Sequence, residues 1–109
     1  MTKTDLLQEM RSIETHLRSI EVQKFFKSET QHTRDRFASQ LNEISQQVAK
    51  LSNDQIAEIA NRLDELSVEI EVGIENLQEE LNKLENAITI LNTISNVLSL
   101  VGRVLEVSV

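Results

Sequence analysis

The chain has 109 residues, 39% of them apolar, and a formal net charge of −7, so it is long enough for one domain with its own core. It contains no cysteine, which excludes disulfides, thiolate metal sites and a thiol nucleophile within this sequence. It also has no proline and only two glycines, residues on which turns and irregular strands usually depend. This composition predicts an all-α protein, and the start of the chain reads as an amphipathic helix rather than a signal peptide, so we expect a cytoplasmic protein.

Charge is distributed unevenly along the chain. Residues 1–53 carry eight basic and seven acidic side chains, whereas residues 54–85 carry two basic and ten acidic ones. The acidic middle would repel phosphates, so the sequence predicts no nucleic-acid partner. It favours instead a basic protein partner, or pairing with the first half of the chain within or between copies.

The first half of the chain predicts a helical hairpin, with helices over residues 4–27 and 33–51. The intervening run from Lys27 to Arg36 has no apolar side chain, which indicates a connection, and Thr33 is the expected N-cap of the second helix. The apolar positions recur at helical spacing and are Leu6, Met10, Ile13, Leu17 and Ile20 in the first helix and Phe37, Leu41, Ile44, Val48 and Leu51 in the second.

Two interpretations apply to the step from Leu51 to the next apolar residue, Ile56. Ser52 and Gln55 have the spacing of a capping box, which predicts that a new helix begins here. Alternatively the helix continues with a stutter, because Val48 and Ile59 are eleven residues apart, about three helical turns. We favour the break.

The second half of the chain carries an apolar seam with heptad spacing, expected on one long helix over residues 54–106. Such a seam cannot be buried by its own helix and needs another helix along it. Its members are Ile56, Ile59, Leu63, Leu66, Ile70, Ile74, Leu77, Leu81, Leu84, Ile88, Leu91, Leu98 and Leu105.

This long helix would measure about 80 Å at 1.5 Å per residue, more than twice the length of either helix of the hairpin. Gly73 is its one weak point, since a glycine within a helix costs about 1 kcal/mol relative to alanine. Either the helix bends or breaks at Gly73 to give a four-helix bundle, or its uncovered half pairs with another copy. We expect the second arrangement, a homo-oligomer and most simply a dimer.

The C-terminal segment, residues 86–109, is uncharged from Asn86 to Gly102. Its polar residues Thr89, Asn92, Asn96 and Ser99 form one stripe, which predicts a helix buried by neighbours on two sides, with the asparagines setting its register. The alternative is a helix that lies on a membrane surface.

Three glutamates, Glu71, Glu75 and Glu79, share one face of the expected long helix, opposite the seam. Carboxylates can bind metal ions or act as acid and base, but only when several elements bring them together. We therefore interpret these residues as a docking surface for a basic partner.

Other candidate sites are weaker. Glu29 and His32 have the E-x-x-H spacing of di-iron bundles, but the motif occurs once and lies in the polar run, so we expect both histidines, His16 and His32, at the surface. The basic and aromatic residues of 24–27 and 34–37 would meet at one end of the hairpin, where the phenylalanines are expected to cap the core.

Together these patterns predict a non-enzymatic helical-bundle or coiled-coil protein that acts as a scaffold, adaptor or regulatory binder, without cofactor or metal. The sequence has no glycine-rich phosphate loop, catalytic triad or zinc-ligand spacing. The alternative function is that of a membrane- or lipid-surface-active protein that uses residues 86–109.

Overall fold

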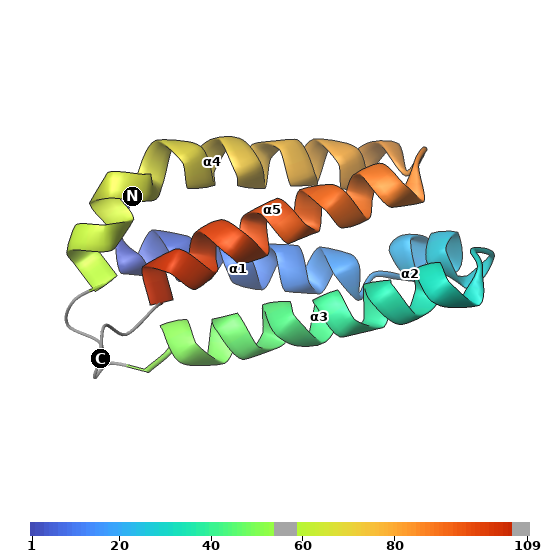
Figure 1. Ribbon diagram of the computed structural model, residues 1–109, viewed down its shortest axis with the longest axis horizontal. Helices are drawn as coiled ribbons and strands as arrows, with labels where there is room; N and C mark the ends of the chain where they lie inside the picture. The colour runs from blue at the N-terminus through green and yellow to red at the C-terminus, as the bar shows by residue number, and fades with distance from the viewer. Residues whose placement is uncertain (54–58, 106–109) are drawn as a thin grey trace.

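Five helices make up the part of the chain that a computed structural model describes, residues 1–53 and 59–105 (Figure 1). They are α1 (Lys3–Leu17), α2 (Ile20–Lys27), α3 (Gln31–Leu51), α4 (Ile59–Lys83) and α5 (Ala87–Leu105). No strand occurs among these residues, and the helices pack as a bundle, so the predicted all-α class is confirmed.

The bundle consists of two helical hairpins stacked on each other. α1 and α2 pack against α3, α4 packs against α5, and the hairpins meet where α1 lies on α4 and α3 lies on α5. Both inter-hairpin pairs run in the same direction, as Figure 1 shows. The molecule measures 42 × 23 × 20 Å. Because α1 and α5 each contact both α3 and α4, the latter two helices occupy opposite corners of the bundle.

The first predicted helix is in fact two helices. α1 ends at Leu17, and Ser19 caps α2 by accepting a hydrogen bond from the backbone N–H of Val22 at 3.4 Å. This corner shifts the helical phase, so that Val22 and Phe26 are buried while Ile20 is 68% exposed. The expectation that Ile20 continues the core face is therefore wrong.

The predicted connection over Lys27 to Arg36 is much shorter than expected. α3 begins at Gln31, and the N-cap is Thr30, whose hydroxyl accepts from the N–H of Thr33 at 3.3 Å. Thr33 itself is buried within the first turn. A helix start can be this polar because Thr33 is the one buried residue among residues 30–35, and the others are exposed to solvent.

The break predicted after Leu51 is confirmed, since α3 ends at that residue. Ser52 is the C-cap of α3, and its hydroxyl donates to the carbonyl oxygen of Val48 at 2.9 Å. Ile56 and the capping box with Gln55 involve residues outside those described.

The long second-half helix breaks at residues 84–86 rather than at Gly73. α4 continues to Lys83, Leu84 adopts a left-handed backbone conformation with φ of 48°, and Asn86 caps α5 by accepting from the N–H of Thr89 at 3.1 Å. A left-handed leucine costs about 1–2 kcal/mol. Its side chain packs against the core, and this burial offsets the cost.

Gly73 has a packing role instead. It is buried in the middle of α4, where a Cβ atom would lie 3.6 Å from both Val97 and Leu100 of α5. A methyl group would fit in contact with these side chains, but a larger side chain would collide with α5 at this point.

Folding back at residues 84–86 buries the seam within one chain. Leu66 and Leu84 are half-buried, and Ile88, in the first turn of α5, is 52% exposed. The other described members of the seam are buried: Ile59, Leu63, Ile70, Ile74, Leu77, Leu81, Leu91, Leu98 and Leu105. The seam is therefore covered without a second copy, and any association between copies has to use another surface.

Two glutamines hold α3 against α5. The side-chain amide of Gln40, only 6% exposed, donates to the carbonyl of Leu91 at 3.1 Å and to the hydroxyl of Ser95 at 2.7 Å. One heptad along both helices, Gln47 donates to the carbonyl of Leu98 at 2.9 Å. Equal spacing on parallel helices sets their register, a role that the sequence predicts for the α5 asparagines, Asn92 and Asn96, which are exposed instead.

Substitutions at Gly73 test the close approach of α4 and α5. In Gly73→Ala the new Cβ meets the flexible amide of Asn96 at 3.2 Å, so we expect a stability equal to the wild type or up to about 1 kcal/mol higher. Gly73→Leu has to push α5 away and should cost about 1–3 kcal/mol. Urea denaturation followed by circular dichroism measures both, and equal stability of the leucine variant would contradict the packing.

Candidate binding surface

An acidic groove runs between the parallel helices α1 and α4. Its volume is about 590 Å³. It is lined by Met1, Asp5, Gln8, Glu9, Glu71, Ile74, Glu75 and Gln78. We call this set the acidic groove.

Helical periodicity places the carboxylates of the groove. Asp5 and Glu9 are four residues apart on α1, and Glu71 and Glu75 are four residues apart on α4, so each pair projects from one side of its helix. All four side chains are exposed, while Ile74 between them is buried. The result is a groove with two acidic walls and an apolar floor.

Asp5 also stabilises the start of α1. Its carboxylate accepts from the backbone N–H of Thr2 at 3.0 Å, and its own N–H donates to the Thr2 hydroxyl at 3.1 Å, which together form a capping box. The hydrogen bonds from Thr2 hold the pKa of the Asp5 carboxyl below its usual 3.8. This member of the groove therefore stays ionised to more acidic pH than a free aspartate.

Of the three glutamates predicted as a docking surface, the structure places two in the groove. Glu71 and Glu75 line it, whereas Glu79 lies further along α4, exposed and 3.5 Å from the ammonium of Lys83. Asp5 and Glu9 were not predicted as part of this surface, because they lie on another helix. Their spacing of four residues was the available signal, but nothing in it indicated that α1 would lie beside α4.

His16 is half-buried between α1 and α4, so the prediction that it lies at the surface is only partly right. Its Nδ1 is 2.9 Å from the side-chain oxygen of Gln78, at the edge of the acidic groove. His32 is exposed on α3 as expected, and Glu29 lies before the helix begins. Among the described residues, no group of three or more histidine, aspartate or glutamate side chains is placed to hold a metal ion.

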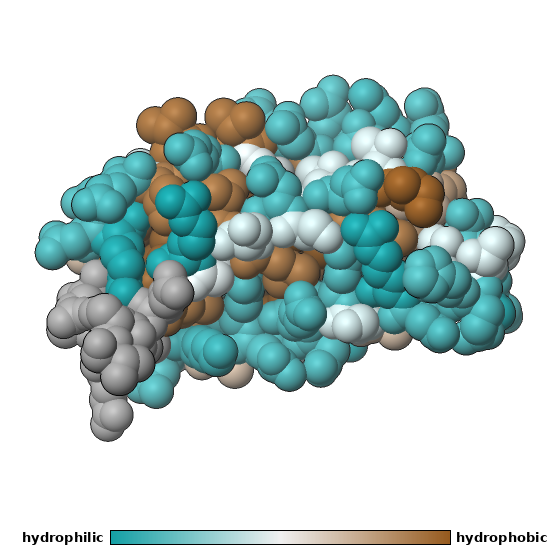
Figure 2. Space-filling view, viewed as in Figure 1, coloured by the Kyte–Doolittle hydropathy of each residue, from teal (hydrophilic) through white to brown (hydrophobic). Residues whose placement is uncertain are grey.

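The outer face of α4 presents two apolar residues among acidic ones. Val68 is 72% exposed and Val72 is 51% exposed, one helical turn apart. Figure 2 shows apolar side chains projecting among hydrophilic ones along the edge of the molecule that α4 forms. Exposed glutamates flank the pair on both sides, and we call the set the valine face: Glu65, Val68, Glu69, Glu71, Val72 and Glu75.

α5 is buried by neighbours on two sides, as the sequence predicts, since it packs on both α3 and α4. Its predicted polar stripe is exposed, and Asn92 accepts a hydrogen bond from Arg36 at 3.1 Å. By length and composition α5 is apolar enough to cross a membrane, but half of its most apolar stretch is buried inside the bundle. Core helices of soluble proteins share this property.

The phenylalanines at the far end of the first hairpin do cap its core. Phe26 and Phe37 stack with ring centroids 4.1 Å apart and planes 8° apart, and Phe25 meets Phe26 edge-on at 5.3 Å. Basic residues surround these rings at the surface, and together they line a second groove between α2 and α3.

Comparisons of the chain with protein-family models, with curated proteins and with solved structures found no match.

Removal of the Thr2 hydroxyl tests the origin of the Asp5 shift. Thr2→Ala removes the contribution of the Thr2 side chain but keeps the backbone N–H that donates to the carboxylate, so the pKa of Asp5 should rise only part of the way toward 3.8. In the wild type, the stabilisation from Asp5 is complete above pH 3.8 and is lost as the pH falls through the lower native pKa. Carboxyl-carbon NMR titration measures the pKa, with Thr4→Ala, an exposed neighbour, as the control.

Proposed function

We propose that this chain is a non-enzymatic protein-binding module that docks a basic segment of a partner protein in the acidic groove. The observation that carries the proposal is the meeting of two carboxylate pairs, from α1 and α4, across an apolar floor. A partner helix or extended segment with lysines or arginines on its edges and an aliphatic residue between them would match this groove in charge and in polarity.

The groove itself has no competing positive side chain, because none of its described lining residues is a lysine or an arginine. Asp5 is already held by Thr2 in the capping box, so Glu9, Glu71 and Glu75 are the carboxylates that a basic partner would pair. Each exposed ion pair contributes only about 0.2–1 kcal/mol, so binding would need several at once. Such a surface favours rapid, salt-sensitive association over high affinity.

The alternative function, activity at a membrane surface, would use α5. It would require α5 to leave its contacts with α3 and α4 and to expose side chains that now form the core, such as Ile90, Ile94 and Val101. It would also break the hydrogen bonds from Gln40 and Gln47. The cost of exposing this surface favours the protein-binding function.

Binding of a basic peptide tests the proposed function. The probe is a fluorescein-labelled amphipathic peptide with lysines flanking a leucine stripe, followed by anisotropy in 50 mM salt. Glu71→Gln/Glu75→Gln should weaken binding about 2- to 30-fold, since two exposed ion pairs are lost. Raising the salt to 200 mM should weaken wild-type binding further.

The matched control is Glu43→Gln/Glu85→Gln, which removes the same charge from exposed positions outside the groove. This variant should bind the peptide as the wild type does. Equal weakening by both variants would mean that net charge alone attracts the peptide, and the groove would be excluded as the site.

Co-sedimentation with vesicles tests the alternative. With α5 in the core, the wild-type protein should remain in the supernatant with phosphatidylcholine vesicles, both alone and with 30% phosphatidylserine added. Gln40→Ala/Gln47→Ala loosens the α3–α5 contact and is the variant most able to release α5. Sedimentation of the wild type with neutral vesicles would favour the membrane function instead.

A further inference from the structure

A second groove, of opposite charge, lies between α2 and α3. Its volume is about 520 Å³. It is lined by Arg18, Ile20, Gln23, Lys24, Phe26, Lys27, Arg34, Phe37, Ala38 and Leu41. Four of these side chains are cationic, and none of the described lining residues is acidic. We call this set the basic groove.

The basic groove has an apolar floor, and an exposed apolar side chain lies at its edge. The stacked rings of Phe26 and Phe37 lie beneath it, and Leu41 is half-buried beside them. Ile20, turned outward by the corner between α1 and α2, stands at its edge with 68% of its surface exposed. The groove therefore presents apolar surface surrounded by positive charge.

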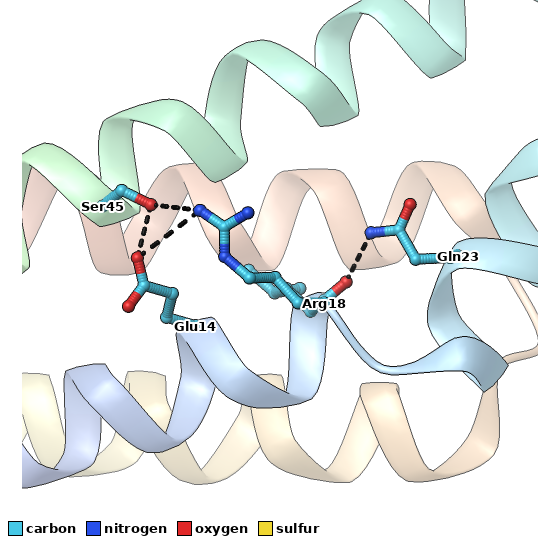
Figure 3. A network of polar contacts seen from close by, with 5 residues as sticks. Glu14, Arg18, Gln23 and Ser45 are labelled. Carbon is cyan, nitrogen blue, oxygen red and sulfur yellow. Dashed lines mark hydrogen bonds and ion pairs between the residues drawn. The ribbon is translucent and has the colours of Figure 1, made fainter.

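Local hydrogen bonds hold one side of this groove in place (Figure 3). Arg18 donates to the Ser45 hydroxyl at 2.8 Å and lies 3.7 Å from the carboxylate of Glu14, to which Ser45 also donates. Gln23 donates to the carbonyl of Leu17 at 3.0 Å and fixes the α1–α2 corner.

Lys24 and Lys27 differ from Arg18, because neither has an acidic partner among the described residues. Their charges are therefore available to a ligand. The hydrogen bonds of Arg18 and Gln23 hold the helices beside them in place.

The valine face of α4 has the complementary chemistry. It offers two aliphatic side chains, Val68 and Val72, which the basic groove can cover with apolar surface, and flanking glutamates that its lysines can pair. Four large apolar residues are prominently exposed in the described chain, and Ile20, Val68 and Val72 are three of them. Contact between the groove and the face would cover all three.

We propose that the basic groove of one copy binds the valine face of a second copy. The inference rests on the proposed function, since it names the partner of the acidic surface of α4. One copy cannot satisfy its own groove, because α3 and α4 occupy opposite corners of the bundle. The two contacting surfaces differ, so the contact is head-to-tail, and each pair of copies retains a free groove on one copy and a free face on the other.

Complementing variants test this arrangement. Lys24→Glu/Lys27→Glu disables the groove but leaves the face, and Val68→Lys/Val72→Lys disables the face but leaves the groove. The wild type should show a mass by light scattering that rises above 12.4 kDa with concentration and returns to it in 1 M salt. Each variant alone should stay at 12.4 kDa, and their mixture should stop at a 1:1 complex of twice that mass.

Two substitutions outside both surfaces serve as controls. Ile88→Lys replaces the fourth exposed apolar residue, and Lys50→Glu reverses an exposed charge on α3. Both should associate as the wild type does, and circular dichroism of all variants checks that each is folded.

A wild type that stays at 12.4 kDa at every concentration, or a mixture that forms no 1:1 complex, would overturn the proposal. A monomeric wild type that sediments with phosphatidylserine vesicles through Lys24 and Lys27 would assign the groove to lipid instead. Peptide binding that depends on Glu71 and Glu75, without self-association, would leave the proposed function standing alone. Formation of the 1:1 complex without any peptide binding would support self-association and would exclude the acidic groove as a peptide-binding site.

Discussion

The packing of α5 on α4 is the contact on which the rest of the structure depends. The chain reverses at Leu84, and α5 packs on α4 at Gly73, where a Cβ atom would lie in van der Waals contact with Val97 and Leu100. This pairing covers a seam that no single helix can bury. It also gives the first hairpin a surface on which to dock, through α1 on α4 and α3 on α5.

Burial of the seam decides what remains at the surface. With its leucines and isoleucines turned inward, α4 presents its glutamates and two valines to solvent, and α1 beside it adds Asp5 and Glu9. At the other hairpin the corner at Ser19 turns Ile20 outward among lysines. The bundle therefore separates its charges into two grooves of opposite sign, and the proposed binding function rests on this separation.

The candidate site was predictable only where it lies on one helix. Glu71 and Glu75 share a face because they are four residues apart, and this spacing identified them from the sequence alone. Asp5 and Glu9 reach the same groove because α1 packs parallel to α4, which is a contact over more than sixty residues of chain. The exposure of Ile20 also depends on the tertiary structure, because the corner between α1 and α2 shifts the helical phase. The sequence did not indicate this corner, since Leu17 and Ile20 have the spacing of one continuous helix.

By itself, the sequence determined the helical class, the apolar seam, the polar stripe of α5 and the separation of charge, because each follows from residue type and a period of 3.5 to 3.6. Only the tertiary structure decided which helix covers the seam and where the chain turns. A heptad pattern indicates that a helical face is buried but does not identify the helix that covers it. Leu77, Leu84 and Leu91 keep the heptad spacing through the chain reversal, so the pattern did not indicate the turn. N-caps such as Ser19 and Asn86 contribute about 1 kcal/mol each, so the packing of whole helices selects which of the possible caps begin a helix.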